Sequence, residues 1–122
     1  MTDPTRDELF NCPTRELDPG FKAEWIQALR SGDYEQTHYG ALRNEGGFCC
    51  LGVACDLVDN SKWHMGSEPG SKANLYDGGI SYPPAWVGEK ISLDFEAQRF
   101  LAELNDTGWS FKEIADWIER NL

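Results

Sequence analysis

Three cysteines lie close together at Cys49, Cys50 and Cys55, and they are the densest group of metal-binding or redox-active side chains in the sequence. Zinc sites usually present their ligands in pairs separated by two to four residues. Cys49 and Cys50 are adjacent, so their side chains diverge, and Cys12 or His64 would have to complete a ligand set. The spacing favours thiols buried in the core, and we predict neither a metal site nor a cofactor.

The histidines and carboxylates nominate no catalytic residue. A catalytic thiol would need a histidine partner, and neither His38 nor His64 lies in a recognisable nucleophile motif. Asp77, Asp94 and Asp106 stand at expected turn or helix-cap positions, which explains them without catalysis. No glycine-rich loop precedes a predicted helix as a phosphate-binding loop would. A small enzyme without a recognisable motif stays an open alternative to a binding protein.

A second group of side chains brings aromatic rings, an amide and a cation into one short region. They are Tyr34, Gln36, Tyr39 and Arg43. Aromatic walls stack on planar groups and arginine pairs with anions, so this group predicts a pocket for a small anionic, nucleotide-like ligand. Arg43 is the cation expected to meet the anion, with Trp25 or Trp86 as a stacking wall. The alternative is an exposed sheet face beside ordinary core tyrosines.

Composition narrows the choice of partner. The 122 residues include 21 acids and 11 bases, for a net charge of −10. Such a surface repels phosphate backbones, so we predict no binding to nucleic acid polymers. The acidity either serves solubility alone or allows the protein to bind and block a basic host protein. A ligand-sequestering protein often forms its pocket at a homo-oligomer interface, so a homo-oligomer is one expected assembly.

The sequence predicts neither a membrane-spanning segment nor a signal peptide. No apolar run approaches the roughly 18 to 20 residues that cross a bilayer, so we predict no membrane association. The first residues are acidic and lack the apolar stretch of a signal peptide. We therefore expect a cytoplasmic protein with reduced cysteines. Residues 1–17 are expected to form a poorly ordered arm, and residues 18–122 a single domain.

Two helices are predicted in the first half of the domain. Asp18 followed by proline predicts a helix start, and Gly32 predicts a left-handed end, which gives a helix over residues 19–31. The segment Cys50–Asp59 is apolar on nearly every side, which is typical of a helix inside a domain.

Two further helices are predicted near the C-terminus. Asp94 is expected to cap the first, whose apolar residues recur at helical spacing. Ser110 and Glu113 have the spacing of a capping box that starts the second. Trp86 and Val87 are expected to anchor the preceding connection to the core.

Two hairpins are expected between the helices. The first would pair Tyr39–Arg43 with Gly47–Cys49 across a glycine-containing turn. The second would pair Asn74–Tyr76 with Gly79–Tyr82, because the Asp-Gly between them suits a tight turn. The predicted fold is therefore a compact α+β domain, with about four helices packed on one or two short antiparallel β-hairpins.

Several blocks of the chain resemble a known protein family. They are Lys22, Trp25, Ala28–Gly32, Tyr34, Gln36, Phe48–Val53, Cys55–Asp56, Leu104–Asp106, Gly108 and Ser110–Asp116. Together they resemble small, largely uncharacterised proteins of tailed bacteriophages and prophages, and the Phe-Cys-Cys-Leu-Gly-Val block is the most specific. The resemblance implies a phage accessory protein that counters host defence. We predict that the protein acts in the host cytoplasm by non-enzymatic binding. The resemblance assigns no activity to particular residues, and the acidic N-terminal arm departs from it.

Overall fold

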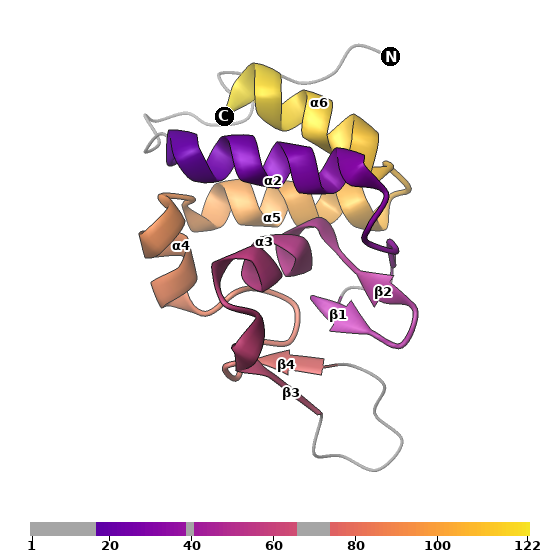
Figure 1. Cartoon of the computed structure of the whole chain (residues 1–122), viewed down its shortest axis with the longest axis vertical. Helices are drawn as coiled ribbons and strands as arrows, with labels where there is room; N and C mark the ends of the chain where they lie inside the picture. The colour runs from indigo at the N-terminus through magenta and orange to yellow at the C-terminus, as the bar shows by residue number, and fades with distance from the viewer. Residues whose placement is uncertain (1–16, 39–40, 66–73) are drawn as a thin grey trace.

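The computed structural model describes residues 17–38, 41–65 and 74–122 (Figure 1). In these ranges the chain forms five α-helices, one 3-10 turn and two antiparallel strand pairs. In order they are α2 (Pro19–Ser31), β1 (Arg43–Asn44), β2 (Gly47–Phe48), α3 (Cys50–Val58), η1 (Asn60–Lys62), β3 (Trp63–Met65), β4 (Asn74–Tyr76), α4 (Ala85–Ile91), α5 (Phe95–Asp106) and α6 (Phe111–Asn121). The predicted α+β fold is confirmed.

The long helices α2, α5 and α6 gather at one end of the molecule, and the strand pairs lie at the other (Figure 1). Helix α6 packs mainly along α2, while α3 contacts both α2 and α5. Arg30 of α2 forms ion pairs with Asp116 and Glu119 of α6, at 2.6 and 2.7 Å. This arrangement makes α3 the link between the helical layer and the strands.

The helix ends follow the capping residues of the sequence. Asp18 accepts a hydrogen bond from the Phe21 N–H at 2.9 Å, and Gly32 ends α2 with a φ of 80°. At the start of α6, Ser110 and Glu113 form a reciprocal capping box. These ends were predicted correctly because capping depends on residues only a few positions apart.

Helix α3 lies in the core, and its motif has a structural explanation. Cys49 caps the helix, with its Sγ accepting a hydrogen bond from the Gly52 N–H at 3.3 Å. A Cβ added to Gly52 would overlap the carbonyl group of Leu42, so glycine allows the residue just before β1 to approach the helix. Cys50 and Cys55 are fully buried free thiols, as expected.

The second hairpin was predicted with the wrong partner. Strand β4 pairs with β3, so that Trp63 lies opposite Tyr76, instead of with residues 79–82. Asp77 and Gly78 do adopt positive φ angles, but beyond them Tyr76 forms only an isolated bridge to Gly79. The ladder stops there, and the next residue, Ile80, instead accepts a hydrogen bond from the Leu42 N–H at 2.7 Å.

Two other elements differ in extent from those expected. The first hairpin is confined to Arg43–Asn44 and Gly47–Phe48, and residues 39 and 40 of its predicted first strand lie outside the described residues. The connection that contains Trp86 is itself a short helix, α4, in which Val87 is fully buried. No helix in the described part of the chain is long and apolar enough to span a membrane.

Candidate functional site

The structure places the predicted ligand-binding residues in different environments. Tyr34 donates its hydroxyl to the Asp56 carboxylate at 2.7 Å and meets the Phe48 ring edge-on at 5.0 Å. Burial, and then the bond to Asp56, raises the pKa of Tyr34 to about 12. Tyr39 lies outside the described residues. Tyr34 is therefore anchored in place by its own domain.

The side-chain amide of Gln36 forms its hydrogen bonds within the fold. Its Nε2 donates to Asn105 Oδ1 at 3.0 Å and to the Trp109 carbonyl at 2.7 Å, while its Oε1 accepts from the Phe111 N–H. Asn105 is fully buried and also accepts from the Cys50 N–H at 3.2 Å. These bonds tie the turn between α5 and α6 to the start of α3, which is a structural task.

The guanidinium group of Arg43 lies over an aromatic wall. Its guanidinium carbon is 4.4 Å from the centre of the Trp63 ring and 5.7 Å from that of Phe48. Its Nε donates to Asn74 Oδ1 at 2.7 Å. Within the described ranges no carboxylate forms an ion pair with it. The protein thus orients the half-buried guanidinium, and no acidic side chain among the described residues neutralises its charge.

Five rings form a continuous aromatic row through this end of the molecule. The row runs through Tyr34, Phe48, Trp63, Tyr76 and Trp86, with successive ring centres 5.0, 5.9, 5.0 and 6.1 Å apart. Asp56 accepts from the Trp63 indole at 3.1 Å as well as from Tyr34. Sequence reasoning missed the row because it paired β4 with the wrong segment, although it named Trp86 as a stacking wall. The other named wall, Trp25, is buried and donates to the Cys50 carbonyl.

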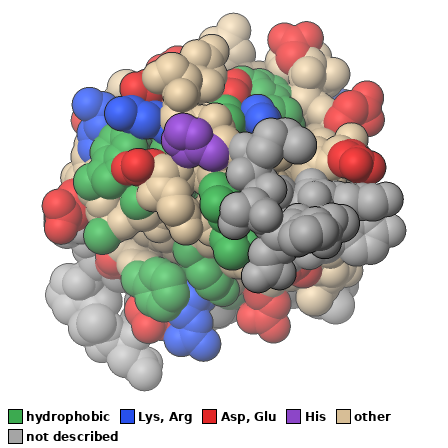
Figure 2. All heavy atoms as spheres, turned by 90° about the horizontal axis from the view of Figure 1, so that it is seen from below, with side chains coloured by type: hydrophobic (Ala, Val, Ile, Leu, Met, Phe, Trp, Pro, Cys, Tyr) green, Lys and Arg blue, Asp and Glu red, His purple; other side chains and the backbone are tan. Residues whose placement is uncertain are grey.

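The Trp86 end of the aromatic row opens into a small hollow of about 270 Å³. Lys62 and Lys90 line it, together with the carboxylates of Asp59 and Asp77, and Asp77 accepts from the Trp86 indole at 2.8 Å. Figure 2 shows the end of the molecule that carries β3 and β4, where hydrophobic, basic and acidic side chains come to the surface near one another. This end is therefore of mixed charge, in contrast to the net charge of −10.

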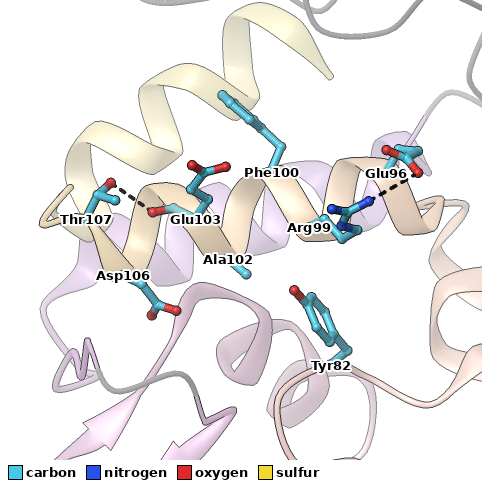
Figure 3. Close-up of a pocket in the computed structure, with 8 residues that line it drawn as sticks. All are labelled: Tyr82, Glu96, Arg99, Phe100, Ala102, Glu103, Asp106 and Thr107. Carbon is cyan, nitrogen blue, oxygen red and sulfur yellow. Dashed lines mark hydrogen bonds and ion pairs between the residues drawn. The ribbon is translucent and has the colours of Figure 1, made fainter.

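A second candidate lies on α5, in a groove of about 460 Å³ that we call the acidic groove (Figure 3). It is lined by Tyr82, Glu96, Arg99, Phe100, Ala102, Glu103, Asp106 and Thr107. Its three carboxylates outnumber its one cation, and Arg99 is already 3.8 Å from Glu96. Tyr82 faces the helix from the opposite wall. The groove is suited to a cationic partner.

The buried thiols do not form a reactive site. Burial raises the pKa of Cys49 to about 11 and that of Cys50 well above the ordinary value, and it also raises the pKa of Cys55. These thiols stay protonated at neutral pH, and the thiol is not the nucleophilic form. Among the residues that the structure describes, no group of three potential metal ligands is found.

Comparison with known proteins places the chain in a family. A family model described as "Domain of unknown function (DUF8296)" matches residues 17–97, more than half of the chain. The matched range contains the whole aromatic row and ends before most of the acidic groove. No curated protein and no solved structure matches the chain. The chain therefore belongs to the DUF8296 family.

Proposed function

We propose that this protein acts by non-enzymatic binding and takes a small anionic, nucleotide-like ligand at Arg43 and the aromatic row. The observation that carries the proposal is the guanidinium held on Trp63 and by Asn74, with no described carboxylate to neutralise it. A guanidinium in a fixed plane can pair with a phosphate or carboxylate through two parallel N–H bonds, and its face can stack on a planar ring.

The surroundings of Arg43 support a site that is organised before the ligand arrives. Asp56 holds Trp63 and Tyr34 at once, through bonds of 3.1 and 2.7 Å. Because the side chains are already ordered, binding loses less conformational entropy than it would at a flexible surface. The resemblance to small phage and prophage proteins supports the further proposal that the ligand is a signalling molecule of host defence, which the protein sequesters.

A ligand screen with paired arginine variants tests this proposal. Thermal shift and calorimetry with cyclic dinucleotides and ADP-ribose derivatives should identify a ligand that stabilises the wild type. Arg43→Ala should then weaken binding by about 10- to 100-fold, since a hydrogen bond to a charged group contributes about 1.5 to 3 kcal/mol. The control is Arg99→Ala, which removes an exposed arginine from the acidic groove and should leave this affinity unchanged.

Two outcomes would reject the anionic-ligand proposal. The first is that none of these compounds shifts the melting temperature of the wild type. The second is that a compound binds equally well to wild type and to folded Arg43→Ala protein. Arg43→Lys separates charge from geometry, because lysine keeps the charge and loses the planar fork, and we expect it to recover only part of the affinity.

The acidic groove favours a second candidate function, in which the protein blocks a basic host protein. The specific observation is that Glu96, Glu103 and Asp106 are all exposed around a groove beside the half-exposed ring of Phe95. Exposed carboxylates steer a basic partner during encounter, and an exposed aromatic ring can serve as its apolar anchor. This mode needs no pocket for a small molecule.

The basic-partner hypothesis is tested by charge reversal in the groove. Purification from host lysate should recover a basic protein with the wild type, and the double variant Glu103→Lys and Asp106→Lys should lose it. The control is Glu24→Lys with Asp33→Lys, which makes the same change in net charge at exposed positions outside the groove. Equal recovery with both double variants would contradict a role for the groove, as would binding that does not weaken when salt is raised.

A further inference from the structure

The hollow at the Trp86 end of the aromatic row has a lining that does not include Arg43. Its volume is about 270 Å³, just below the roughly 300 Å³ at which drug-sized pockets begin. Trp86 and Val58 give it apolar walls, and the rest of its lining consists of four charged side chains: Asp59, Lys62, Asp77 and Lys90. Two cations and two carboxylates, from separate segments of the chain, therefore border one small space.

Each of the two carboxylates is held in place through one of its oxygens. Asp59 Oδ1 accepts from the Ser61 N–H at 2.9 Å and from the Ser61 hydroxyl at 2.6 Å. Asp77 Oδ2 accepts from the Trp86 indole at 2.8 Å. The second oxygen of each, Asp59 Oδ2 and Asp77 Oδ1, receives no hydrogen bond from the described part of the protein. Both carboxylates are thus oriented by the fold and keep an oxygen that can accept.

The two lysines bring positive charge that the fold leaves unpaired. Neither Lys62 nor Lys90 takes part in an ion pair among the described residues. Lys90 follows Trp86 by one helical turn in α4, which places both side chains on the same face of that helix. The Lys62 carbonyl accepts from the Asp77 N–H at 3.1 Å, and this bond fixes η1 beside the turn after β4. The backbone therefore holds both lysines at the border of the hollow.

These opposite charges lie near one another without pairing directly. Hydrogen bonds from Ser61, followed by the charges of Lys62 and Lys90, hold the pKa of Asp59 below its usual range. Both ammonium groups are close enough to favour the ionised carboxylate, although neither forms an ion pair with it. A molecule that carries one positive and one negative group would meet both kinds of charge at once, whereas a simple anion or cation would be attracted by one kind and repelled by the other.

We propose that this hollow binds a compact zwitterion of the amino-acid type. The carboxylate of the ligand pairs with the ammonium groups of Lys62 and Lys90. Its own ammonium group donates to the free carboxylate oxygens of Asp59 and Asp77, and its apolar body lies against the Trp86 ring. The small volume suits a ligand of this size better than a nucleotide, so the site and its ligand are distinct from those at Arg43.

Three probes that share a phenyl ring on a short chain test the need for both charges. They are L-phenylalanine, which is a zwitterion, phenethylamine, which lacks the carboxylate, and 3-phenylpropionate, which lacks the ammonium group. In NMR titrations of the wild type, phenylalanine should produce a saturable shift of the Trp86 indole N–H, identified by its loss in Trp86→Phe. The two singly charged probes should bind at least about tenfold more weakly, the change expected for the loss of one charged hydrogen bond.

Lysine variants test the carboxylate contact. Lys62→Met and Lys90→Met keep most of the apolar stem and remove the charge, and each should weaken phenylalanine binding about tenfold. The matched control is Lys112→Met, an exposed position on α6 that does not line the hollow, and it should leave the affinity unchanged. Arg43→Ala should also leave it unchanged, which separates this site from the one at Arg43.

Asp77→Asn tests the ammonium contact with little change in structure. Asparagine tolerates the positive φ of 46° at this position and keeps an acceptor for the Trp86 indole. Phenylalanine should bind more weakly to this variant, while 3-phenylpropionate should bind more tightly because a repelling charge has gone. A purely structural effect would change both affinities in the same direction.

Three outcomes would overturn the zwitterion proposal. The first is that phenylalanine causes no saturable shift of the Trp86 indole at millimolar concentration. The second is that either singly charged probe binds the wild type as tightly as phenylalanine does. The third is that the affinity for phenylalanine is the same in the wild type and in folded protein that carries both Lys62→Met and Lys90→Met.

Discussion

The aromatic row and the acidic groove are built in opposite ways. Around the row, the polar groups are bound to the protein itself: Asp56 holds Tyr34 and Trp63, and Asn74 holds Arg43. In the groove, the charged side chains of α5 extend into solvent, and the pair between Arg99 and Glu96 leaves both more than half exposed. We call the row the rigid region, because its polar groups are bonded within the fold, and the groove the adaptable region, because its charged side chains extend into solvent.

This difference indicates two kinds of binding. An oriented cation with aromatic walls discriminates ligands by shape and hydrogen-bond geometry, since little remains to be ordered when the ligand binds. Exposed carboxylates act mainly on the rate of encounter, and salt screens them. The rigid region therefore suits a small ligand and the adaptable one a protein surface. Variants in each region test whether the two regions are as independent as this comparison implies.

The largest effect is expected from Gly52→Ala. The added methyl group would overlap the Leu42 carbonyl, so α3 and the backbone of Leu42 must separate, and we expect a loss of about 3 kcal/mol in unfolding free energy. Leu42 directly precedes Arg43, so the NMR signals of the aromatic row should shift more than those of the acidic groove. Denaturant melts and an assigned spectrum measure both.

The control for Gly52→Ala is Gly20→Ala, also in a helix. Its added Cβ would lie 3.5 Å from the Asp18 carboxylate, an ordinary contact, and alanine favours the helix. Unfolding free energy should stay the same or rise slightly. A loss in the Gly52 variant no larger than in the control would contradict the close approach of Leu42 to α3.

Asn105→Leu should weaken both regions together. The fully buried amide donates to the Thr37 carbonyl at 2.7 Å and accepts from the Cys50 N–H and from Gln36. Leucine fills a similar volume and leaves buried polar groups unpaired, so we expect a loss of about 2 to 4 kcal/mol. Hydrogen exchange should quicken at the end of α5 and in the segment near Gln36. Faster exchange at only one of these places would show that the regions are not joined through Asn105.

Tyr34→Phe should have a smaller effect that depends on pH. The pKa of Tyr34 is raised to about 12 from 10.0, so between these values the unfolded chain has lost the proton that the folded chain keeps. The unfolded state then binds fewer protons, and stability falls as pH rises. The contribution of the raised Tyr34 pKa to the unfolding free energy is fully present below pH 10. Urea melts at increasing pH should show a shallower alkaline decline in the variant, with about 1 kcal/mol lost at neutral pH from the missing hydrogen bond. Parallel declines would contradict the raised pKa.

The smallest effect on stability is expected in the acidic groove. Glu103→Lys with Asp106→Lys changes two exposed side chains, and the unfolding free energy should stay within about 0.5 kcal/mol of the wild type. Thermal and urea melts measure it at low and moderate salt. A loss above about 1 kcal/mol would show that these carboxylates stabilise the fold, and the contrast with the aromatic row would then fail.

The sequence by itself determined the features that depend on near neighbours. Asp18, Gly32 and the Ser110–Glu113 box set helix ends through bonds that join residues three or four positions apart or through the backbone of one residue. The apolar run after Cys49 determined that α3 would be buried, and the mixture of such helices with short strands determined the α+β class. Local hydrogen bonds and periodicity need no knowledge of distant partners.

Only the tertiary structure decided which distant residues meet. The sequence nominated Gln36 as a ligand-binding residue. In the fold, however, its amide donates a hydrogen bond to Asn105, which lies 69 positions away in the chain. Arg43 is oriented because its Nε donates a hydrogen bond to Asn74 of β4. The sequence did not predict that β4 pairs with β3, which places Asn74 there. Trp63 joined the aromatic row through the same pairing. Strand partners and buried amide contacts are chosen by the packing of the whole chain, because many pairings satisfy local preferences equally well.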